Sequence, residues 1–167
     1  MEQHPVLPAR EPASATLPWH TSPPNRILVV EDDDTLRSLN VEVLMDSGYH
    51  VDAAKDGETA WQALKTGSYH LLITEHNMPK VTGIELLKAL HGARIALPVI
   101  MATGALPKWE FTRHPWLEPA ATLLKPYSVA ELLGAVKAVL RATDNSGGQI
   151  TLPLNWHSRP SPDRLRP

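Results

Sequence analysis

The sequence has 167 residues, of which 43% are hydrophobic and 20% are charged, and this composition is close to that of an average globular protein. The formal net charge of −2 excludes a strong electrostatic attraction to nucleic acid or to an acidic membrane. The absence of cysteine excludes disulfides, thiolate nucleophiles and cysteine-bound metals, and no apolar run approaches the roughly 20 residues that span a bilayer.

Proline divides the chain into three parts. Six of the 16 prolines lie in residues 1–25 and four lie in residues 145–167. Each proline removes a backbone donor and fixes φ, so these ends are poorly suited to helices or central strands. We therefore expect a proline-rich disordered tail at 1–25, one folded domain at 26–144, and a tail with proline and arginine at 145–167. The N-terminus lacks the features of a secretory signal, which favours a cytoplasmic protein.

Between the tails, short apolar runs alternate with segments of helical period. In chain order, the pattern predicts a strand at 27–30, a helix through Leu36, Leu39, Val43 and Leu44, a strand at 50–54, a helix at 60–64, a strand at 70–74, a helix at 84–90, a strand at 98–102, a short helix near 108–113, a strand at 121–124 and a helix at 129–140. Five such units in sequence predict an α/β fold with a parallel sheet and helices on both faces.

Polar residues follow four of the five expected strands. Glu31 and Asp32 follow the first, Glu75 the third, Thr103 the fourth and Lys125 the fifth. In an open parallel sheet these ends form the functional site, and carboxylates that share a buried site need a cation. Oxygen-only ligands favour Mg²⁺, while a lysine ammonium and a threonine hydroxyl suit phosphoryl oxygens. The pattern therefore predicts phosphoryl transfer to a carboxylate.

Four segments, taken together, resemble the response regulator receiver domain of two-component signalling, of the chemotaxis-regulator type: ILVVEDD, HLLITEHNMPKVTG, PVIMATG and LLKPY. The resemblance covers about residues 26–142. It implies a flavodoxin-like (βα)5 fold, a three-layer sandwich with a parallel sheet in the strand order 2-1-3-4-5. Pro126 matches a family position that often follows a cis peptide bond.

The resemblance also implies roles for the residues at the strand ends. Glu31 and Asp32 match the acidic pair that holds Mg²⁺, and Asn77 matches the residue whose backbone carbonyl reaches the metal. Thr103 matches the switch hydroxyl, and Lys125 matches the lysine that contacts the phosphoryl group.

One position departs from the family pattern and decides how the site is interpreted. Glu75 stands at the phosphoacceptor position, where the family has aspartate, and residues 71–82 contain no aspartate that could replace it. Glu75 is also expected among the metal ligands. Its extra methylene displaces the carboxylate, and a displacement of about 1 Å can cost about 10²-fold in rate. A longer acidic side chain can also partly imitate an aspartyl phosphate, with less charge and fewer oxygens. A second departure is Thr122, where the family usually has an aromatic switch residue.

These observations favour a stand-alone signalling receiver without enzymatic activity. It is either a poor phosphoacceptor or, as we prefer, a pseudo-receiver that Glu75 holds in one state. The resemblance implies a histidine kinase or phosphotransfer protein as one partner. It also implies a downstream protein that binds the face of the fourth helix, fifth strand and fifth helix, where Trp109 and Trp116 are candidates. No helix-turn-helix unit remains in the sequence, so direct DNA binding is not expected.

Other interpretations are less favoured. A small flavodoxin-like cofactor-binding protein would need a loop rich in Gly, Ser or Thr after the first strand, and this loop is acidic. A metal-dependent phosphatase with an aspartate nucleophile would need that aspartate after the first strand and a cap domain. Asp33 and Asp34 are expected to cap the first helix, and His76 is expected to be a solvent-facing loop residue rather than a metal ligand.

Overall fold

Strands and helices alternate along the whole folded part of the chain. The computed structural model describes residues 24–145. The strands are β1 (Arg26–Val30), β2 (His50–Ala54), β3 (Leu71–Thr74), β4 (Val99–Thr103) and β5 (Ala121–Leu124). The helices are α1 (Asp34–Asp46), α2 (Gly57–Thr66), α3 (Gly83–Gly92), α4 (Lys108–Arg113) and α5 (Val129–Asn145), with a 3-10 turn, η1 (Pro115–Leu117), before β5. The tails expected from the proline content lie almost entirely outside the described residues.

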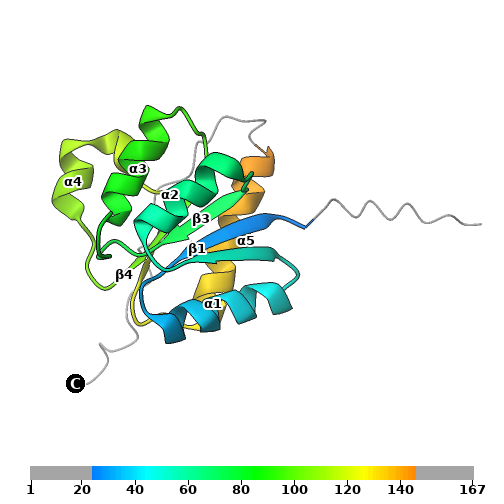
Figure 1. Cartoon of the computed structure of the whole chain (residues 1–167). Helices are drawn as coiled ribbons and strands as arrows, with labels where there is room; N and C mark the ends of the chain where they lie inside the picture. Colours follow the sequence, from blue (N-terminus) through cyan, green and yellow to red (C-terminus); the bar gives the residue numbers. More distant parts are fainter. Residues whose placement is uncertain (1–23, 146–167) are drawn as a thin grey trace, which may run out of the picture.

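The strands form one parallel sheet in the order β2-β1-β3-β4-β5 (Figure 1). Helices α2 and α3 cover one face and helices α1 and α5 cover the other. Side chains alternate between the two layers, since Leu28 and Leu72 pack under α2 and α3 whereas Ile27 and Ile73 pack under α1 and α5. The flavodoxin-like (βα)5 fold and its strand order are therefore confirmed.

Buried side chains explain why the inner strands are continuous apolar runs. All four residues of β3 and all five of β4 are buried, because helices cover both faces of the sheet. The edge strand β2 is only partly buried, which explains its weaker apolar pattern. Among residues 24–145, no helix has the length and apolar character needed to cross a membrane.

Local signals set the helix ends. Asp33 caps α1 by accepting a hydrogen bond from the backbone N–H of Leu36 at 2.8 Å, as the sequence predicts. Gly48, with φ of +89°, allows the chain to leave α1, since this conformation favours glycine. Helix α3 starts with a capping box between Thr82 and Glu85.

One residue of α1 is wrongly predicted to lie on its buried apolar face. Leu39 is exposed, and the buried positions of this helix are Asn40 and Leu44. The buried amide of Asn40 is satisfied by a hydrogen bond that it donates to the Tyr127 hydroxyl at 2.9 Å, which ties α1 to the loop after β5.

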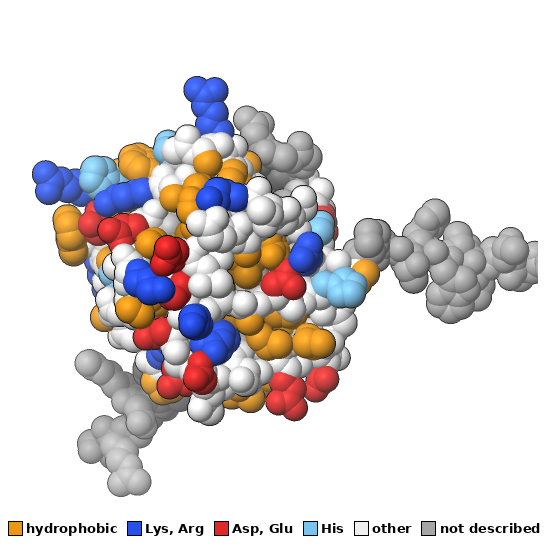
Figure 2. Space-filling model, in the orientation of Figure 1, with side chains coloured by type: hydrophobic (Ala, Val, Ile, Leu, Met, Phe, Trp, Pro, Cys, Tyr) orange, Lys and Arg blue, Asp and Glu red, His pale blue; other side chains and the backbone are white. Residues whose placement is uncertain are grey.

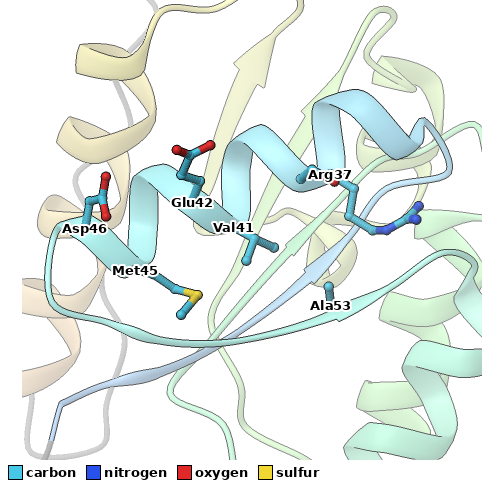
Figure 3. Close-up of a pocket in the computed structure, with 7 residues that line it drawn as sticks. Arg37, Val41, Glu42, Met45, Asp46 and Ala53 are labelled. Atoms are coloured by element: carbon cyan, nitrogen blue, oxygen red, sulfur yellow. The ribbon is translucent and has the colours of Figure 1, made fainter.

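The surface is mixed in character. Figure 2 shows one face on which acidic, basic and hydrophobic side chains are interspersed, as expected for a net charge of −2. A hollow of about 450 Å³ lies between α1 and the edge strand β2, lined by Arg37, Val41 and Met45 of α1 and Ala53 of β2 (Figure 3). None of the predicted site residues lines this hollow.

Two glycines make a matched test of this packing. A Cβ on Gly57 would overlap the carbonyl oxygen of Val81, whereas a Cβ on Gly92 would meet nothing within 4 Å. We expect Gly57→Ala to lower the free energy of unfolding by about 1–3 kcal/mol, the range for overpacking. Gly92→Ala should instead raise it by about 0.5–1 kcal/mol, because alanine is less flexible in the unfolded chain. Urea unfolding of both variants measures this, and equal effects would contradict the close contact between α2 and the loop after β3.

Candidate functional site

The site residues are held by the sheet itself. Glu31 directly follows β1, and its backbone N–H donates to Ala54 of β2 at 3.2 Å. Glu75 follows β3 and donates to Val30 of β1 at 3.0 Å, while Lys125 follows β5 and donates to Thr103 of β4 at 2.9 Å. Each residue therefore continues the hydrogen-bond ladder of its strand by one step, at the carboxyl edge where the sequence places the site.

Lys125 joins the two glutamates. Its Nζ atom lies 2.7 Å from Oε2 of Glu31 and 2.6 Å from Oε2 of Glu75. The two carboxylate side chains are almost fully buried, with 3% and 6% exposed, while 22% of the Lys125 side chain remains exposed. A single ammonium thus neutralises two carboxylates that would otherwise repel each other in a poorly solvated site.

The second oxygen of Glu75 is also bound. Oε1 accepts hydrogen bonds from the backbone N–H groups of His76 at 2.6 Å and Asn77 at 3.0 Å. Burial alone would raise the pKa of Glu75, but hydrogen bonds from Lys125, Thr103 and the Asn77 backbone outweigh it and hold this pKa below its ordinary value. Glu75 is therefore firmly ionised at neutral pH.

The pKa values of Glu31 and Lys125 are raised, whereas that of Glu75 is lowered. Burial raises the pKa of Glu31 above its ordinary value, although Lys125 works against this. Burial would lower the pKa of Lys125, yet its contacts with Glu31 and Glu75 raise it. The lysine therefore stays protonated as long as both carboxylates face it.

A second ion pair positions the loop that holds Glu75. Lys80 adopts a φ of +68°, which is uncommon for a residue with a side chain. Its Nζ atom lies 3.0 Å from Oδ2 of the buried Asp56 and 3.3 Å from Oε2 of Glu58. Glycine at position 83 is required as well, since a Cβ there would lie 2.5 Å from the carbonyl oxygen of Glu75. The loop is thus fastened to α2 by Lys80 and packed closely at the start of α3, just after the amides that bind Glu75.

Known proteins resemble this chain in both sequence and fold. Residues 27–137 match the family described as response regulator receiver domain. The chain belongs to this family. The receiver is 38% identical over 140 residues to the transcriptional regulatory protein CpxR of Escherichia coli (strain K12), covering 78% of this chain and 59% of CpxR. It is 35% identical over 121 residues to the alkaline phosphatase synthesis transcriptional regulatory protein PhoP of Bacillus subtilis (strain 168), covering 71% of this chain and 50% of PhoP.

Solved structures agree on the fold. The chemotaxis response regulator CheY4 of Vibrio cholerae is 26% identical with a TM-score of 0.62, covering 70% of this chain and 98% of CheY4. A CheY-like receiver protein of Methanospirillum hungatei has a TM-score of 0.69 at 24% identity, covering 73% of this chain and 98% of that chain. The chain spans between 50% and 62% of the length of the curated relatives named here and of a further relative, the transcriptional regulatory protein DltR of Streptococcus agalactiae. These comparisons support a receiver domain of two-component signalling and do not favour a flavodoxin-like cofactor binder.

Receivers typically bind Mg²⁺ at the phosphorylation site, and the ligands predicted for it here are Glu31, Asp32, Glu75 and the Asn77 carbonyl. Glu31 and Glu75 come together, but on Lys125, and Asp32 is exposed outside their contact. Asn77 contributes its N–H to Glu75. Among residues 24–145, no group of three or more acidic, His or Cys side chains is placed to hold a metal ion. The oxygen donors suit a hard cation in their chemistry, but the arrangement around Lys125 does not form a site for one.

The structure also places three further features that the sequence singles out: Thr103, the Lys125–Pro126 bond and His76. Thr103 is buried at the end of β4, and its hydroxyl contributes to the low pKa of Glu75. The Lys125–Pro126 bond is cis, as the resemblance predicts. His76 is half-buried, and its Nδ1 atom is buried without a hydrogen-bond partner, so the prediction of a solvent-facing side chain is only partly right.

Sequence reasoning missed the pair of Asp56 and Lys80. Asp56 precedes the first residue of α2 and caps that helix by accepting a hydrogen bond from the Thr59 backbone N–H, a role that aspartate commonly has at this position. Nothing in the sequence near Lys80 indicates that its side chain would reach back to Asp56, because that contact depends on the tertiary approach of α2 to the loop after β3.

The pH dependence of stability tests this pair. Hydrogen bonds from the Thr59 backbone and side chain, and then from Lys80, hold the pKa of Asp56 far below its ordinary value of 3.8. Ionised Asp56 therefore contributes stability above that ordinary value, and this contribution is lost as the pH falls below it. Asp56→Asn should lower the free energy of unfolding at pH 7 and reduce its dependence on pH below about 4. Urea unfolding across this range measures the slope, with Asp46→Asn, an exposed residue of α1, as the control; an unchanged slope would contradict the pairing.

Proposed function

We propose that this receiver is a signalling module whose output state is set by Glu75 without phosphorylation. The observation that carries the proposal is the carboxylate of Glu75, which accepts two backbone N–H groups and the Lys125 ammonium. The charge at the acceptor position is therefore permanent. Moving a two-state population from 1:99 to 99:1 takes a bias of about 5.5 kcal/mol. Charge-assisted contacts such as those of Glu75 supply only part of that free energy. Glu75 thus sets a preference that partner binding can complete.

Both oxygens of Glu75 have donors, which argues against efficient phosphoryl acceptance. A nucleophilic oxygen would have to leave Lys125 or the loop amides before it could attack a phosphodonor. The extra methylene also changes its position relative to Thr103 and Lys125, and in-line transfer tolerates little displacement.

The proposed partners are proteins. A histidine kinase or phosphotransfer protein is the proposed upstream partner, in keeping with the family. The proposed downstream surface is the face of α4, β5 and α5, where three large hydrophobic side chains are exposed: Trp109, Leu124 and Val129. We further propose that the module acts in the cytoplasm, that it has no enzymatic activity of its own, and that the described domain does not itself contact DNA.

Treatment with acetyl phosphate and Mg²⁺, followed by intact mass spectrometry, tests the role of Glu75. The parent protein should gain no phosphoryl group. Glu75→Asp should gain one, because the shorter side chain withdraws from Lys125 and restores the family's acceptor. Glu42→Asp, the same exchange on the exposed face of α1, is the control and should behave as the parent does. Phosphorylation of the parent at the rate of Glu75→Asp would refute the proposal and leave a functional glutamate acceptor.

Indole N–H resonances in an NMR spectrum test whether the charge of Glu75 reaches the proposed output face. Thr103 contributes to the binding of Glu75 and ends the strand that leads to α4, so Glu75→Gln should shift the Trp109 indole resonance. Trp61 on α2 packs against the core on the same face of the sheet and should shift less, which makes it the internal control. Equal shifts of both indoles, or none at Trp109, would mean that the site is not coupled to α4.

A further inference from the structure

The site at the carboxyl edge of the sheet holds two buried negative charges close to each other. Glu31 and Glu75 are buried carboxylates whose Oε2 atoms lie within 2.7 Å of one nitrogen. Two such charges destabilise each other unless a cation lies between them. In this chain the cation is the side chain of Lys125, which comes from the same polypeptide.

The position of Lys125 is constrained from two directions. Its backbone N–H is bound to Thr103 of β4, and two residues later the Tyr127 hydroxyl accepts a hydrogen bond from the buried Asn40 of α1. The ammonium has three donors, and two of them satisfy Glu31 and Glu75. These backbone and side-chain contacts hold the Lys125 ammonium between the two carboxylates.

The remaining oxygens are also engaged. Oε1 of Glu75 accepts two loop amides, and Oε1 of Glu31 lies 3.4 Å from the backbone N of Asp33. Mg²⁺ demands near-octahedral coordination by oxygens and gives up water reluctantly. To bind between these glutamates it would have to displace an ammonium already in place, and the third predicted carboxylate, Asp32, lies outside their contact.

We infer that the Lys125 ammonium takes the place of the divalent cation in this receiver, so that the bridge Glu31–Lys125–Glu75 is complete without Mg²⁺. The prediction of a Mg²⁺ site at Glu31, Asp32, Glu75 and the Asn77 carbonyl is replaced by a site with a built-in cation. This inference rests on the proposed function in treating Glu75 as a permanent part of the site. It concerns metal binding alone and needs neither a phosphodonor nor a partner.

Thermal unfolding and isothermal titration calorimetry of the full chain at neutral pH, in EDTA and in millimolar Mg²⁺, test the inference. The parent should have the same Tm in both and show no saturable Mg²⁺ binding. Lys125→Met should have a lower Tm in EDTA, because two buried carboxylates lose their counter-charge, and Mg²⁺ should restore part of it. The Kd of this variant for Mg²⁺ should lie at least about fivefold below the highest Mg²⁺ concentration at which the parent shows no saturation, and fivefold is the lower end of typical coupling between linked sites.

Three further variants make the result specific. Lys125→Arg retains the positive charge and should remain insensitive to Mg²⁺. The double variant with Glu31→Gln and Lys125→Met has a single carboxylate, so it should fold and lose the response to Mg²⁺. Lys137→Met removes an exposed lysine of α5 and should behave as the parent does.

The outcomes separate this inference from the proposed function. If the parent binds Mg²⁺ as tightly as Lys125→Met does, the inference is overturned, whatever the phosphodonor experiment shows. If Lys125→Met folds only in Mg²⁺, the inference is supported. If Lys125→Met fails to fold in either condition, the parent decides: a rise of its Tm in Mg²⁺ that Glu31→Gln abolishes overturns the inference, and no such rise supports it. Phosphorylation of the parent would refute the proposed function without bearing on the Mg²⁺ titration.

Discussion

The arrangement of the whole site depends on one lysine between two buried glutamates. Lys125 makes it possible to bury Glu31 and Glu75 at the ends of neighbouring strands, where an unpaired carboxylate would be costly. Desolvation and pairing compete at every member of this bridge, and pairing prevails at Glu75 and Lys125 whereas desolvation prevails at Glu31. The pKa of Glu75 is lowered and that of Glu31 is raised, which indicates that the ionised form of Glu75 is the better stabilised of the two. Glu75 has amide donors in addition to the lysine.

The bridge and the surrounding elements support one another. The sheet places the three residues by backbone hydrogen bonds, and the loop after β3 adds two amides to Glu75. That loop is in turn held by Lys80 on Asp56 at the start of α2. The charge of one acceptor-position residue is thus connected through α2, α3 and β4 to the surface helices, which is the physical basis for expecting that it influences α4.

Much of this was predictable from the sequence, and the reasons for the failures are specific. The strands β1, β3 and β4 stand out because burial on both faces demands uninterrupted apolar residues. The convergence of Glu31, Glu75, Thr103 and Lys125 follows from the topology of a parallel sheet. Asn40 in place of Leu39, Lys80 on Asp56, and Asp32 outside the carboxylate contact were not predictable, because each depends on which side chain reaches a particular partner in three dimensions. Local periodicity does not contain that information.

The backbone hydrogen bonds of Glu31, Glu75 and Lys125 have a consequence for motion. Functional groups on mobile loops open and close at little cost, but these three residues extend the ladder of the central sheet. Their amide protons should therefore exchange with solvent as slowly as those of the strands, through opening of the domain as a whole. A receiver built in this way has a rigid acceptor position, so any movement that accompanies signalling must arise in the helices and loops around it.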